Sequence, residues 1–484
     1  MQSLKQPSLF KQASYLNGTW IDTQQREAIA VHNPFNQQHI GDVPSLTHDD
    51  VCQAVQAAEH AQHAWQKLTA KQRANYLHAW ADLIDQHQDD LARIMTIEQG
   101  KPLHEARGEI AYANSFVRWF AEEGKRIYGD VIPANTAQLR HVILKQPVGV
   151  CAAITPWNFP AAMITRKVAP ALAAGCTMIV KPAMETPFSA IALAELAHQA
   201  GIPAGVLQIL TGSSSTIGQV LTQDERVHKL SFTGSTEVGR ILMQQCASTV
   251  KKLSMELGGN APFIVFDDAD LHKAADGLIA SKYRNAGQTC VCANRIYVHR
   301  SVKDEFLRIF SEKVQALKVG DGLQAGTDIG PLINQDALDK VQFLLQDAVH
   351  KGATIITGGQ THSSSPLSFQ PTIITDLNDD MAIAHDEIFG PIAPVFIFDD
   401  EDEVIAAANH TIYGLAAYFY TQNMARSWRV AEALQYGMVA QNTGLLSTEV
   451  APFGGVKQSG FGREGSKYGI DEYVSTKYWC LDVN

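Results

Sequence analysis

The middle of the chain alternates short β-rich runs with longer segments of helical patterning. The runs at residues 149–154, 177–180, 206–210 and 229–232 each precede a helix-like segment, and a second alternating series extends from residue 262 to about residue 420. This alternation predicts βαβ units and parallel sheets. A chain of 484 residues is also longer than one hydrophobic core can serve. We therefore expect two α/β domains.

The two ends of the chain fit around that plan. Residues 51–68 and 71–99 carry apolar side chains at three-to-four spacing, which predicts two helices, with Thr47 and Thr69 as candidate N-caps. Residues 473–481 predict a closing strand.

Composition and charge exclude several classes of protein. Hydrophobic residues make up 45% and charged residues 18% of the chain, as in soluble globular proteins. The net charge of -11 argues against nucleic acid, whose phosphates would be repelled. The sequence has no signal-peptide core and no apolar stretch of about 18 residues that predicts a membrane helix. Seven scattered cysteines fit a reducing cytoplasm, and their spacings predict no metal site.

Two strand ends carry candidate anion-binding groups. Lys181 follows the apolar run 177–180, at the end where ligands of open α/β sheets bind, although a solvated lysine at a strand end is a simpler interpretation. Gly234 and Ser235 follow another run and open a helix, whose free N–H groups could hold a phosphate. Many Gly-Ser turns, however, serve chain geometry only.

Three further motifs contain groups that could do chemistry. Glu256 precedes Gly258-Gly259 in apolar company, which raises a carboxyl pKa and suits a general base. Cys290 follows a polar, glycine-containing loop, a setting in which a thiolate is reactive. Asn158 offers an amide donor that an oxyanion hole could use. The structural alternatives are a helix-end glutamate, an inert core cysteine and an N-cap asparagine.

Taken together, six motifs resemble one family. The segments that carry the resemblance are 283–290 (YRNAGQTC), 255–260 (MELGGN), 156–160 (PWNFP), 232–235 (FTGS), 387–391 (EIFGP) and 452–455 (PFGG). In this order, and over nearly the whole chain, they resemble the aldehyde dehydrogenase superfamily. Chance agreement of six such motifs is negligible, so the structural alternatives lose most of their weight.

The resemblance implies a chemical mechanism. Cys290 would attack the aldehyde carbon, while the Asn158 amide and the Cys290 backbone N–H hold the oxyanion. Hydride transfer to the nicotinamide would leave a thioester, which water activated by Glu256 hydrolyses. Related enzymes that pass the acyl group to coenzyme A generally lack this glutamate, so Glu256 favours hydrolysis. The implied activity is NAD(P)⁺-dependent oxidation of an aldehyde to a carboxylate.

The resemblance also implies a cofactor site. Trp157 and Lys181 would lie along the adenosine half, Ser235 at the pyrophosphate, and Glu387 with Phe389 at the nicotinamide ribose. The full set of expected contacts is Thr155, Pro156, Trp157, Lys181, Ala183, Met184, Gly234, Ser235, Leu257, Glu387 and Phe389.

Met184 departs from the family pattern. NAD⁺-preferring relatives place a glutamate here, and succinate-semialdehyde enzymes that use NADP⁺ often place a serine. Methionine has no charge that would repel a 2′-phosphate and no hydroxyl that would bind it. We therefore favour NADP⁺, with NAD⁺ as the alternative.

A closer similarity is to succinate-semialdehyde dehydrogenases. It rests on the segments 164–167 (ITRK), 291–294 (VCAN) and 462–469 (GREGSKYG). In that branch, residues at the positions of Arg166, Arg284 and Ser447 bind the substrate carboxylate, and a buried guanidinium is a natural partner for a carboxylate. The alternative for Arg166 is a helix arginine that snorkels to solvent from an apolar stripe.

The family implies a three-part fold. We expect a Rossmann-like cofactor domain (residues 1–128 and 148–258), an α/β catalytic domain (259–455), and a small β extension with bridging segments (129–147 and 456–484) that joins subunits. A homodimer or homotetramer is the usual assembly among relatives.

Three alternatives concern function and control. The chain could act on glutarate semialdehyde or an uncharged aldehyde, whereas betaine aldehyde is disfavoured because Arg166 and Arg284 would repel its ammonium group. A non-catalytic family member would not need Cys290 and Glu256 together. Cys292, two residues after a thiol expected to ionise readily, could pair with Cys290 as a redox switch.

Overall fold

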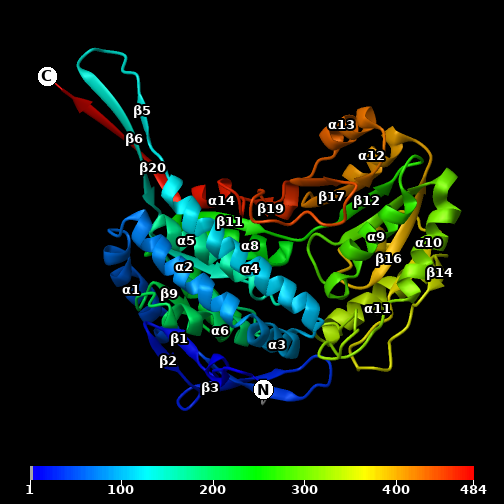
Figure 1. Ribbon diagram of the computed structural model, residues 1–484, viewed down its shortest axis with the longest axis horizontal. Coiled ribbons are helices and arrows are strands. Elements are labelled where there is room, and N and C mark those ends of the chain that lie inside the picture. Colours follow the sequence, from blue (N-terminus) through cyan, green and yellow to red (C-terminus); the bar gives the residue numbers. More distant parts are fainter. Residues whose placement is uncertain (1–3, 484) are drawn as a thin grey trace.

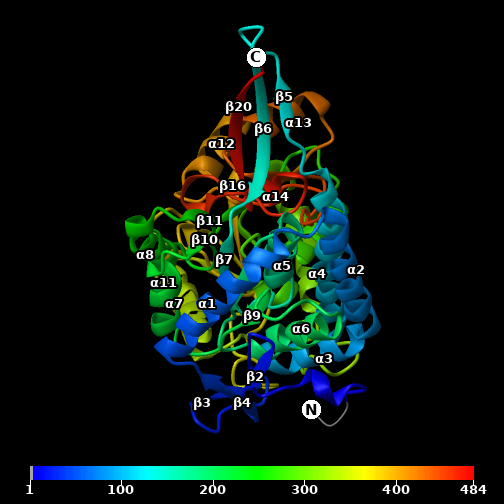
Figure 2. The same ribbon diagram turned by 90° about the vertical axis from the view of Figure 1, so that its left-hand side faces the viewer.

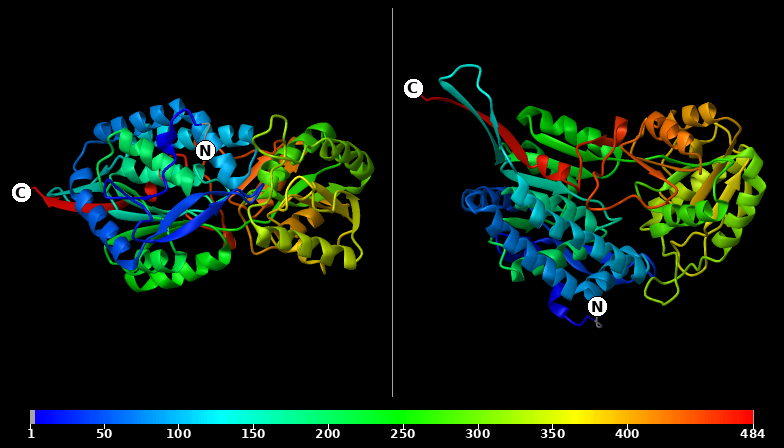
Figure 3. Two further views of the ribbon diagram at one scale, coloured as in Figure 1. Left: turned by 90° about the horizontal axis from the view of Figure 1, so that it is seen from below. Right: turned by 45° about the horizontal axis from the view of Figure 1, so that its top comes forward.

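The computed structural model describes residues 4–483, whose strands form four sheets. Figure 1 shows two large lobes and a narrow sheet that projects from one of them, with the C-terminus near its tip. The two lobes lie side by side when the molecule is seen from below (Figure 3). Among residues 4–483, no helix is both long enough and apolar enough to cross a membrane.

The first lobe contains an eight-stranded sheet in the described part of the chain. Its order is β19-β11-β10-β7-β8-β9-β1-β2, and the strands from β11 to β9 run parallel. The strands are β1 (Ser14–Leu16), β2 (Thr19–Ile21), β7 (Val150–Ile154), β8 (Thr177–Lys181), β9 (Leu207–Ile209), β10 (Val227–Thr233), β11 (Lys252–Glu256) and β19 (Gly460–Phe461). The helices are α1 (His48–Trp65), α2 (Ala70–Gln86), α3 (Gln88–Gln99), α4 (Leu103–Glu123), α5 (Ala162–Ala174), α6 (Pro187–Gln199), α7 (Ser214–Gln223) and α8 (Thr236–Cys246).

Helices cover both faces of this sheet. In β7, Cys151 and Ala153 pack in a core with α2, α4, α5 and α6, whereas Val150 and Ala152 pack with α1, α7 and α8. Successive strand residues point to opposite faces, so a strand covered on both sides must be apolar throughout. The four β-rich runs of the first series are confirmed as β7 to β10, each followed by a helix.

The second lobe has a seven-stranded sheet within the described residues, in the order β14-β15-β16-β13-β12-β17-β18. Its strands are β12 (Ala261–Val265), β13 (Ala293–His299), β14 (Thr354–Thr357), β15 (Thr372–Thr375), β16 (Ile392–Phe398), β17 (Ala416–Tyr420) and β18 (Met438–Gln441). Its helices are α9 (Leu271–Lys282), α10 (Lys303–Gln315), α11 (Gln335–His350), α12 (Glu401–Asn409) and α13 (Met424–Ala433). All its neighbouring strands are parallel except β14 and β15, as the second alternating series predicted.

The N-terminal helices differ from the prediction at one point. Thr47 and Thr69 are confirmed as N-caps of α1 and α2, each within a capping box. Residues 71–99, predicted as one helix, form α2 and α3, which are separated at His87 (φ -107°, ψ 17°). Asp90, in the first turn of α3, accepts hydrogen bonds from the backbone N–H groups of Lys5 and Gln6. The spacing of apolar residues could not predict the break at His87, because that spacing continues across it and carries no information on these tertiary hydrogen bonds.

A three-stranded sheet projects from the first lobe (Figures 1 and 2). It consists of β5 (Asp130–Ile132), β6 (Leu139–Pro147) and β20 (Val474–Asp482), in the antiparallel order β20-β6-β5. The predicted closing strand is thereby confirmed as β20, which follows the short helix α14 (Tyr468–Asp471). A separate hairpin of β3 (Glu27–His32) and β4 (His39–Ser45) lies at the opposite end of the first lobe.

Candidate active site

The carboxyl ends of three parallel strands carry the first group of site residues. β7 leads into the turn that contains Asn158, β10 leads into Ser235, and β11 ends at Glu256. Cys290 comes from the second lobe, just before β13, and lines one cavity together with these three residues. The site therefore occupies the edge of the first sheet at which ligands of open α/β sheets bind. Glu256 ends a strand, so the helix-end alternative is wrong.

The loop that presents Cys290 has a strained backbone. Asn285 and Ala286 adopt left-handed φ values of 52° and 55°, which are uncommon for residues with a Cβ atom. The Asn285 side-chain amide donates to the Asn158 carbonyl oxygen at 3.0 Å. A Cβ atom on Gly259 would stand only 2.3 Å from the Cys290 carbonyl oxygen, so this approach requires glycine. Strain of this kind is typical of functional sites.

Two cavities meet at Cys290, which lines both of them. The first, here called the arginine cavity, has a volume of about 300 Å³, and its wall includes Arg166, Arg284 and Ser447, the three residues expected to bind substrate. The second, here called the tryptophan cavity, has a volume of about 350 Å³. Its wall brings together these expected residues: Pro156, Trp157, Asn158, Gly234, Ser235, Glu256, Leu257, Glu387 and Phe389.

Two buried cations beside the arginine cavity share one carboxylate. Arg166, which is 1% exposed, and Lys167 both pair with the single carboxylate of Glu464. Arg166 Nη2, Arg284 Nε and Thr289 Oγ1 are buried and have no hydrogen-bond partner among the described residues. An unpaired buried polar group costs about 1–3 kcal/mol. These groups therefore indicate a ligand that accepts hydrogen bonds, and Arg166 does not snorkel to solvent.

The tryptophan cavity contains groups that fit a dinucleotide. The rings of Trp157 and Phe389 meet edge to face at 5.5 Å, and Phe389 has a left-handed φ of 53°. Glu387 Oε1 accepts from the Gly259 N–H at 3.0 Å, and burial raises the pKa of Glu387 to about 7. Ser235 caps α8, whose N-terminus faces the cavity. A helix N-terminus suits a pyrophosphate, and a carboxylate suits ribose hydroxyls.

The two groups expected to react both have raised pKa values. Burial, and then the Glu387 charge, raises the pKa of the Cys290 thiol to about 12 against the opposing effect of Arg166. We expected a readily ionised thiol, but burial disfavours the thiolate. Burial and then the nearby Glu464 raise the pKa of Glu256 well above its ordinary range, as its apolar company predicted. Both Glu256 side-chain oxygens lack a hydrogen-bond partner among the described residues.

Four expected cofactor contacts line neither cavity: Thr155, Lys181, Ala183 and Met184. Lys181 ends β8, is 4% exposed, and donates from Nζ to Ser214 Oγ at 2.9 Å, so it is not a solvated lysine. Met184 Sδ accepts from the Gly212 N–H at 3.4 Å and lines a third cavity. Asn334 lines both this third cavity and the tryptophan cavity, so the two cavities adjoin. Met184 therefore lies outside the wall of the tryptophan cavity, in the cavity next to it.

Cys292 lies behind the nucleophile loop. Its buried Sγ faces the carbonyl oxygens of Lys282 and Ala293, both at 3.5 Å. It lines neither cavity, whereas Cys290 lines both. A redox pairing of the two thiols stays a prediction.

Several residues of the cavity walls were not predicted. Lys340 lies in the tryptophan cavity, and Phe453 lies in the arginine cavity, with its ring centroid 3.9 Å from the Arg166 guanidinium carbon. Lys340 has no signal in the sequence, whereas Phe453 belongs to the 452–455 motif, to which no role in the site was assigned. Tyr112 also lines the arginine cavity, together with Glu105 and Glu109 of the same helix α4. These three polar residues share one helix face at spacings of four and three, a signal that could have identified them.

Comparisons with known proteins agree with this geometry. The family model described as "Aldehyde dehydrogenase family" matches residues 20–479. The chain is 58% identical to a succinate-semialdehyde dehydrogenase [NADP(+)] of Escherichia coli, over 99% of this chain and 100% of that protein. It is also 58% identical to a glutarate-semialdehyde dehydrogenase of Pseudomonas putida, with the same coverage.

A solved structure gives the same result for the fold. The aldehyde dehydrogenase of Brucella melitensis biovar abortus superposes with a TM-score of 0.99 and 60% identity, and the match covers 100% of both chains. Family membership therefore accounts for the two lobes, the projecting sheet and the cavities that meet at Cys290. The chain belongs to the aldehyde dehydrogenase family.

Proposed function

We propose that the chain oxidises a short aldehyde that carries a carboxylate at its far end, with succinate semialdehyde as the first candidate and NAD(P)⁺ as the oxidant. The observation that supports this proposal most directly is the position of Cys290, whose side chain lines both cavities. A substrate in one cavity and a dinucleotide in the other would both reach the same thiol. The names of two close relatives support the same class of substrate.

The substrate carboxylate would bind in the arginine cavity. Arg166 and Arg284 each have a buried N–H group without a partner among the described residues, and Ser447 lies in the same wall. A guanidinium presents paired donors that match a carboxylate, which makes arginine a better partner than lysine here. The aldehyde end would then face Cys290.

In the first half of the reaction, Cys290 Sγ would bond to the aldehyde carbon and its proton would pass to water. The developing oxyanion would accept hydrogen bonds from the Cys290 backbone N–H and from Asn158 Nδ2, which already donates to the Gln288 carbonyl oxygen at 3.1 Å and has a second N–H. NAD(P)⁺, when bound, accepts the hydride that leaves the aldehyde carbon. Trp157, Ser235 and Glu387 would hold it in the tryptophan cavity.

In the second half, Glu256 would remove a proton from the water that hydrolyses the Cys290 thioester. It lines the same cavity as Cys290, and neither of its oxygens has a hydrogen-bond partner among residues 4–483. A carboxyl group with a raised pKa is a stronger base once it ionises. The carboxylate product and the regenerated thiol complete the cycle.

Glutarate semialdehyde is the second candidate substrate. Two relatives of equal identity are named for succinate semialdehyde and for glutarate semialdehyde, which differ by one methylene group. One methylene changes binding in an apolar pocket by only about 1–3 kcal/mol. Chain length is therefore a matter of kinetic preference within one mechanism.

The proposal assigns a role to each part of the chain. Residues 1–128 and 148–258 would bind the cofactor, residues 259–455 would carry the nucleophile, and residues 129–147 with 456–484 would join subunits into a dimer or tetramer. We favour NADP⁺ because Lys181 is a buried cation and Met184 brings no charge that would repel a 2′-phosphate.

The proposal is tested by Arg284→Met, with butanal as the matched substrate that lacks a carboxylate. We expect kcat/KM for succinate semialdehyde to fall because a charge-assisted contact is lost. The loss corresponds to an increase of about 2–4 kcal/mol in the activation free energy. Oxidation of butanal should change little. Equal losses with both aldehydes would show that Arg284 supports the fold instead, and a parent enzyme with no aldehyde oxidation would overturn the proposed activity.

A further inference from the structure

Lys101 is buried beneath the turn that carries Asn158. It lies in the link between α3 and α4 and is 2% exposed. Its Nζ donates to the Asn158 carbonyl oxygen at 2.8 Å, pairs with Glu109 Oε2 at 2.5 Å, and lies 4.0 Å from the centroid of the Phe159 ring. A single ammonium group thus contacts two adjacent residues of the Asn158 turn. Lys101 itself lines neither cavity.

Glu109 connects the same ammonium group to α5. Its Oε1 accepts from the backbone N–H groups of Ala161 (2.9 Å) and Ala162 (3.3 Å), at the start of that helix. Ala161 occupies the N-cap position and has no side chain that could do this. Since α5 also carries Arg166, the Lys101–Glu109 pair holds both the Asn158 turn and the helix that follows it.

The nucleophile loop is tied to the same segment of chain. The Asn158 carbonyl oxygen accepts a second hydrogen bond, from Asn285 Nδ2 at 3.0 Å. Asn285 is held in turn by Gln99 Nε2, which donates to its Oδ1 at 2.9 Å, and by Glu105 Oε2, which accepts from its backbone N–H at 2.9 Å. The carbonyl of Asn158 therefore joins the Lys101 ammonium to the loop that presents Cys290.

We infer that Lys101 is a positioning residue for the oxyanion hole, an assignment that rests on the function proposed for Asn158 and Cys290. Lys101 fixes the peptide plane that follows Asn158, and so sets the direction in which the Asn158 side-chain amide points. It touches no reacting atom.

A purely stabilising role explains this arrangement poorly. A buried ion pair contributes little net stability compared with apolar side chains of similar size, because both charges lose their hydration. The geometry of an oxyanion donor, in contrast, matters steeply. Loss of one such donor costs about 100-fold to 1000-fold in kcat, and a displacement of about 1 Å costs about 100-fold.

The experiment measures hydrolysis of p-nitrophenyl acetate, which needs no dinucleotide and no aldehyde. Cys290 Sγ would bond to the acetyl carbon, p-nitrophenolate would leave, and water would then release acetate. The release of p-nitrophenolate, which precedes the hydrolytic step assigned to Glu256, depends on the nucleophile and the oxyanion hole. We expect Lys101→Met to slow the release of p-nitrophenolate by about 100-fold.

A double-mutant cycle with Asn158→Ala separates positioning from general damage. If Lys101 acts through the Asn158 amide, Lys101→Met should add less than about threefold loss in the Asn158→Ala background. A further 100-fold loss in that background, or full ester hydrolysis by Lys101→Met alone, would overturn the inference.

Two further variants control for folding. The double variant Lys101→Met/Glu109→Gln removes both members of the ion pair and keeps an oxygen that can accept from α5, so it should recover part of the lost thermal stability without recovering activity. Lys229 is equally buried, pairs with Glu472 at 3.5 Å and lines neither cavity. Lys229→Met should lower thermal stability but keep the rate of ester hydrolysis. Loss of aldehyde oxidation in a parent enzyme that still cleaves the ester would count against the proposed function and leave the role of Lys101 standing.

Discussion

Glu256 combines two properties that give the reaction a defined pH dependence. Its carboxyl oxygens have no hydrogen-bond partner among the described residues, and burial, followed by repulsion from Glu464, raises its pKa well above the ordinary range. A protonated carboxyl group cannot accept a proton from water. The base form appears only as the pH rises through the raised pKa, so hydrolysis of the thioester should accelerate in the alkaline direction.

The variant Glu256→Gln tests this assignment. We expect a burst of reduced cofactor, because Cys290 still acylates, followed by turnover that is at least about 100-fold slower. In the parent enzyme, steady-state kcat should rise as the pH increases through the raised pKa of Glu256, and this rise should be absent in the variant. Stopped-flow absorbance at each pH measures both phases. Normal steady-state turnover by the variant would rule out Glu256 as the base.

Met184 gives a prediction for cofactor preference. Met184 follows Lys181 by three residues in the sequence. The buried Lys181 Nζ donates to the neutral Ser214 hydroxyl, and the Met184 side chain adds no negative charge. Met184→Glu would place a carboxylate where a 2′-phosphate with about two negative charges must bind. We expect the Kd for NADP⁺ to rise at least about tenfold, with NAD⁺ much less affected, whereas Met184→Leu should change neither. Titration of protein fluorescence measures both constants, and unchanged NADP⁺ binding would place this side chain away from the 2′ position.

The reacting residues could be predicted from the sequence because each lies in a short contiguous motif. Cys290, Asn158 and Glu256 can be recognised without knowing what packs around them. Lys101 could not be assigned in this way, since its partner Asn158 is distant in the sequence and meets it only through the fold. The pKa of Cys290 was misjudged for the same reason, because it depends on the burial that the assembled site creates.

For helices and strands, features that depend on neighbouring residues could be predicted from the sequence, whereas features that depend on tertiary contacts could not. The caps at Thr47 and Thr69 follow from neighbouring residues alone, so the sequence was sufficient to predict them. The break at His87 was missed because it depends on Asp90 and the backbone of the N-terminal segment. The parallel strands could be predicted because a strand buried on both faces is a continuous apolar run. Such a run can be recognised without knowing which strands lie beside it.

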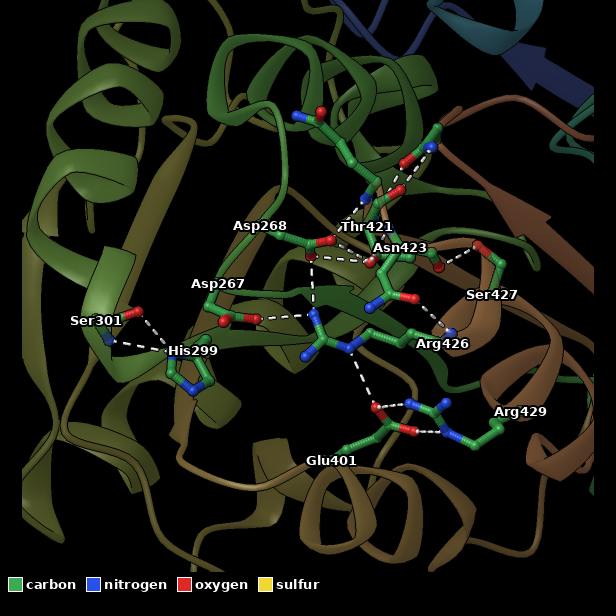
Figure 4. Close-up of polar contacts among 12 residues, drawn as sticks. Asp267, Asp268, His299, Ser301, Glu401, Thr421, Asn423, Arg426, Ser427 and Arg429 are labelled. Atoms are coloured by element: carbon green, nitrogen blue, oxygen red, sulfur yellow. Dashed lines mark hydrogen bonds and ion pairs between the residues drawn. The ribbon is translucent and has the colours of Figure 1, made fainter.

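Helix α13 is attached to the second lobe through Arg426 (Figure 4). Arg426 Nη1 lies 2.8 Å from carboxylate oxygens of both Asp267 and Asp268, its Nε lies 3.1 Å from Glu401, and its guanidinium carbon lies 4.6 Å from the centre of the Phe266 ring. Its side chain is 18% exposed, so solvent screens these contacts only in part. Removal of this cation would leave Asp267 and Asp268 without it, while Arg429 would still pair with Glu401 at 2.7 Å.

We therefore expect Arg426→Met to destabilise the second lobe by about 1–2 kcal/mol after allowance for screening, which lowers its thermal midpoint by about 2–6 °C. Arg308→Met, which removes exposed pairs on α10, is the matched control and should have no measurable effect.

The pKa of Asp268 is lowered, because Thr421, Gln422 and Arg426 together outweigh burial. The contribution of Asp268 to stability is therefore present above its unfolded pKa and lost as the pH falls. Differential scanning calorimetry at neutral and acidic pH measures both effects, and equal losses for the two variants would contradict this account.

For the whole molecule, the two lobes explain why the site lies between them. The first lobe contributes Asn158, Ser235 and Glu256 at the edge of one sheet, and the second contributes Cys290 and Glu387. Neither lobe contains a complete site. The order of the motifs along the chain indicated this division, but the shape of the two cavities depends on how the lobes pack.

The projecting sheet presents apolar surface that no other element among residues 4–483 covers. Val131, Val142 and Trp479 are cross-strand neighbours on β5, β6 and β20, and Val131 is 77% and Trp479 50% exposed. Three strands with uncovered faces bury too little apolar surface to be stable alone, and such a row of side chains is typical of a subunit interface. A second copy of the chain is the expected partner, since symmetric homo-oligomers are the commonest assembly.

The double variant Val131→Lys/Trp479→Lys tests this expectation. Each lysine must lose its hydration when the row is covered by another subunit, so the substitutions should weaken association while leaving the two lobes folded. We expect the parent enzyme to elute as a dimer or tetramer in size-exclusion chromatography with light scattering, and the variant to shift toward the monomer. The conservative variant Trp479→Phe keeps an apolar ring at the same position and should retain the parent's assembly. An unchanged oligomer with both lysines in place would mean that this row lies outside the interface, and subunits would then have to associate through another surface.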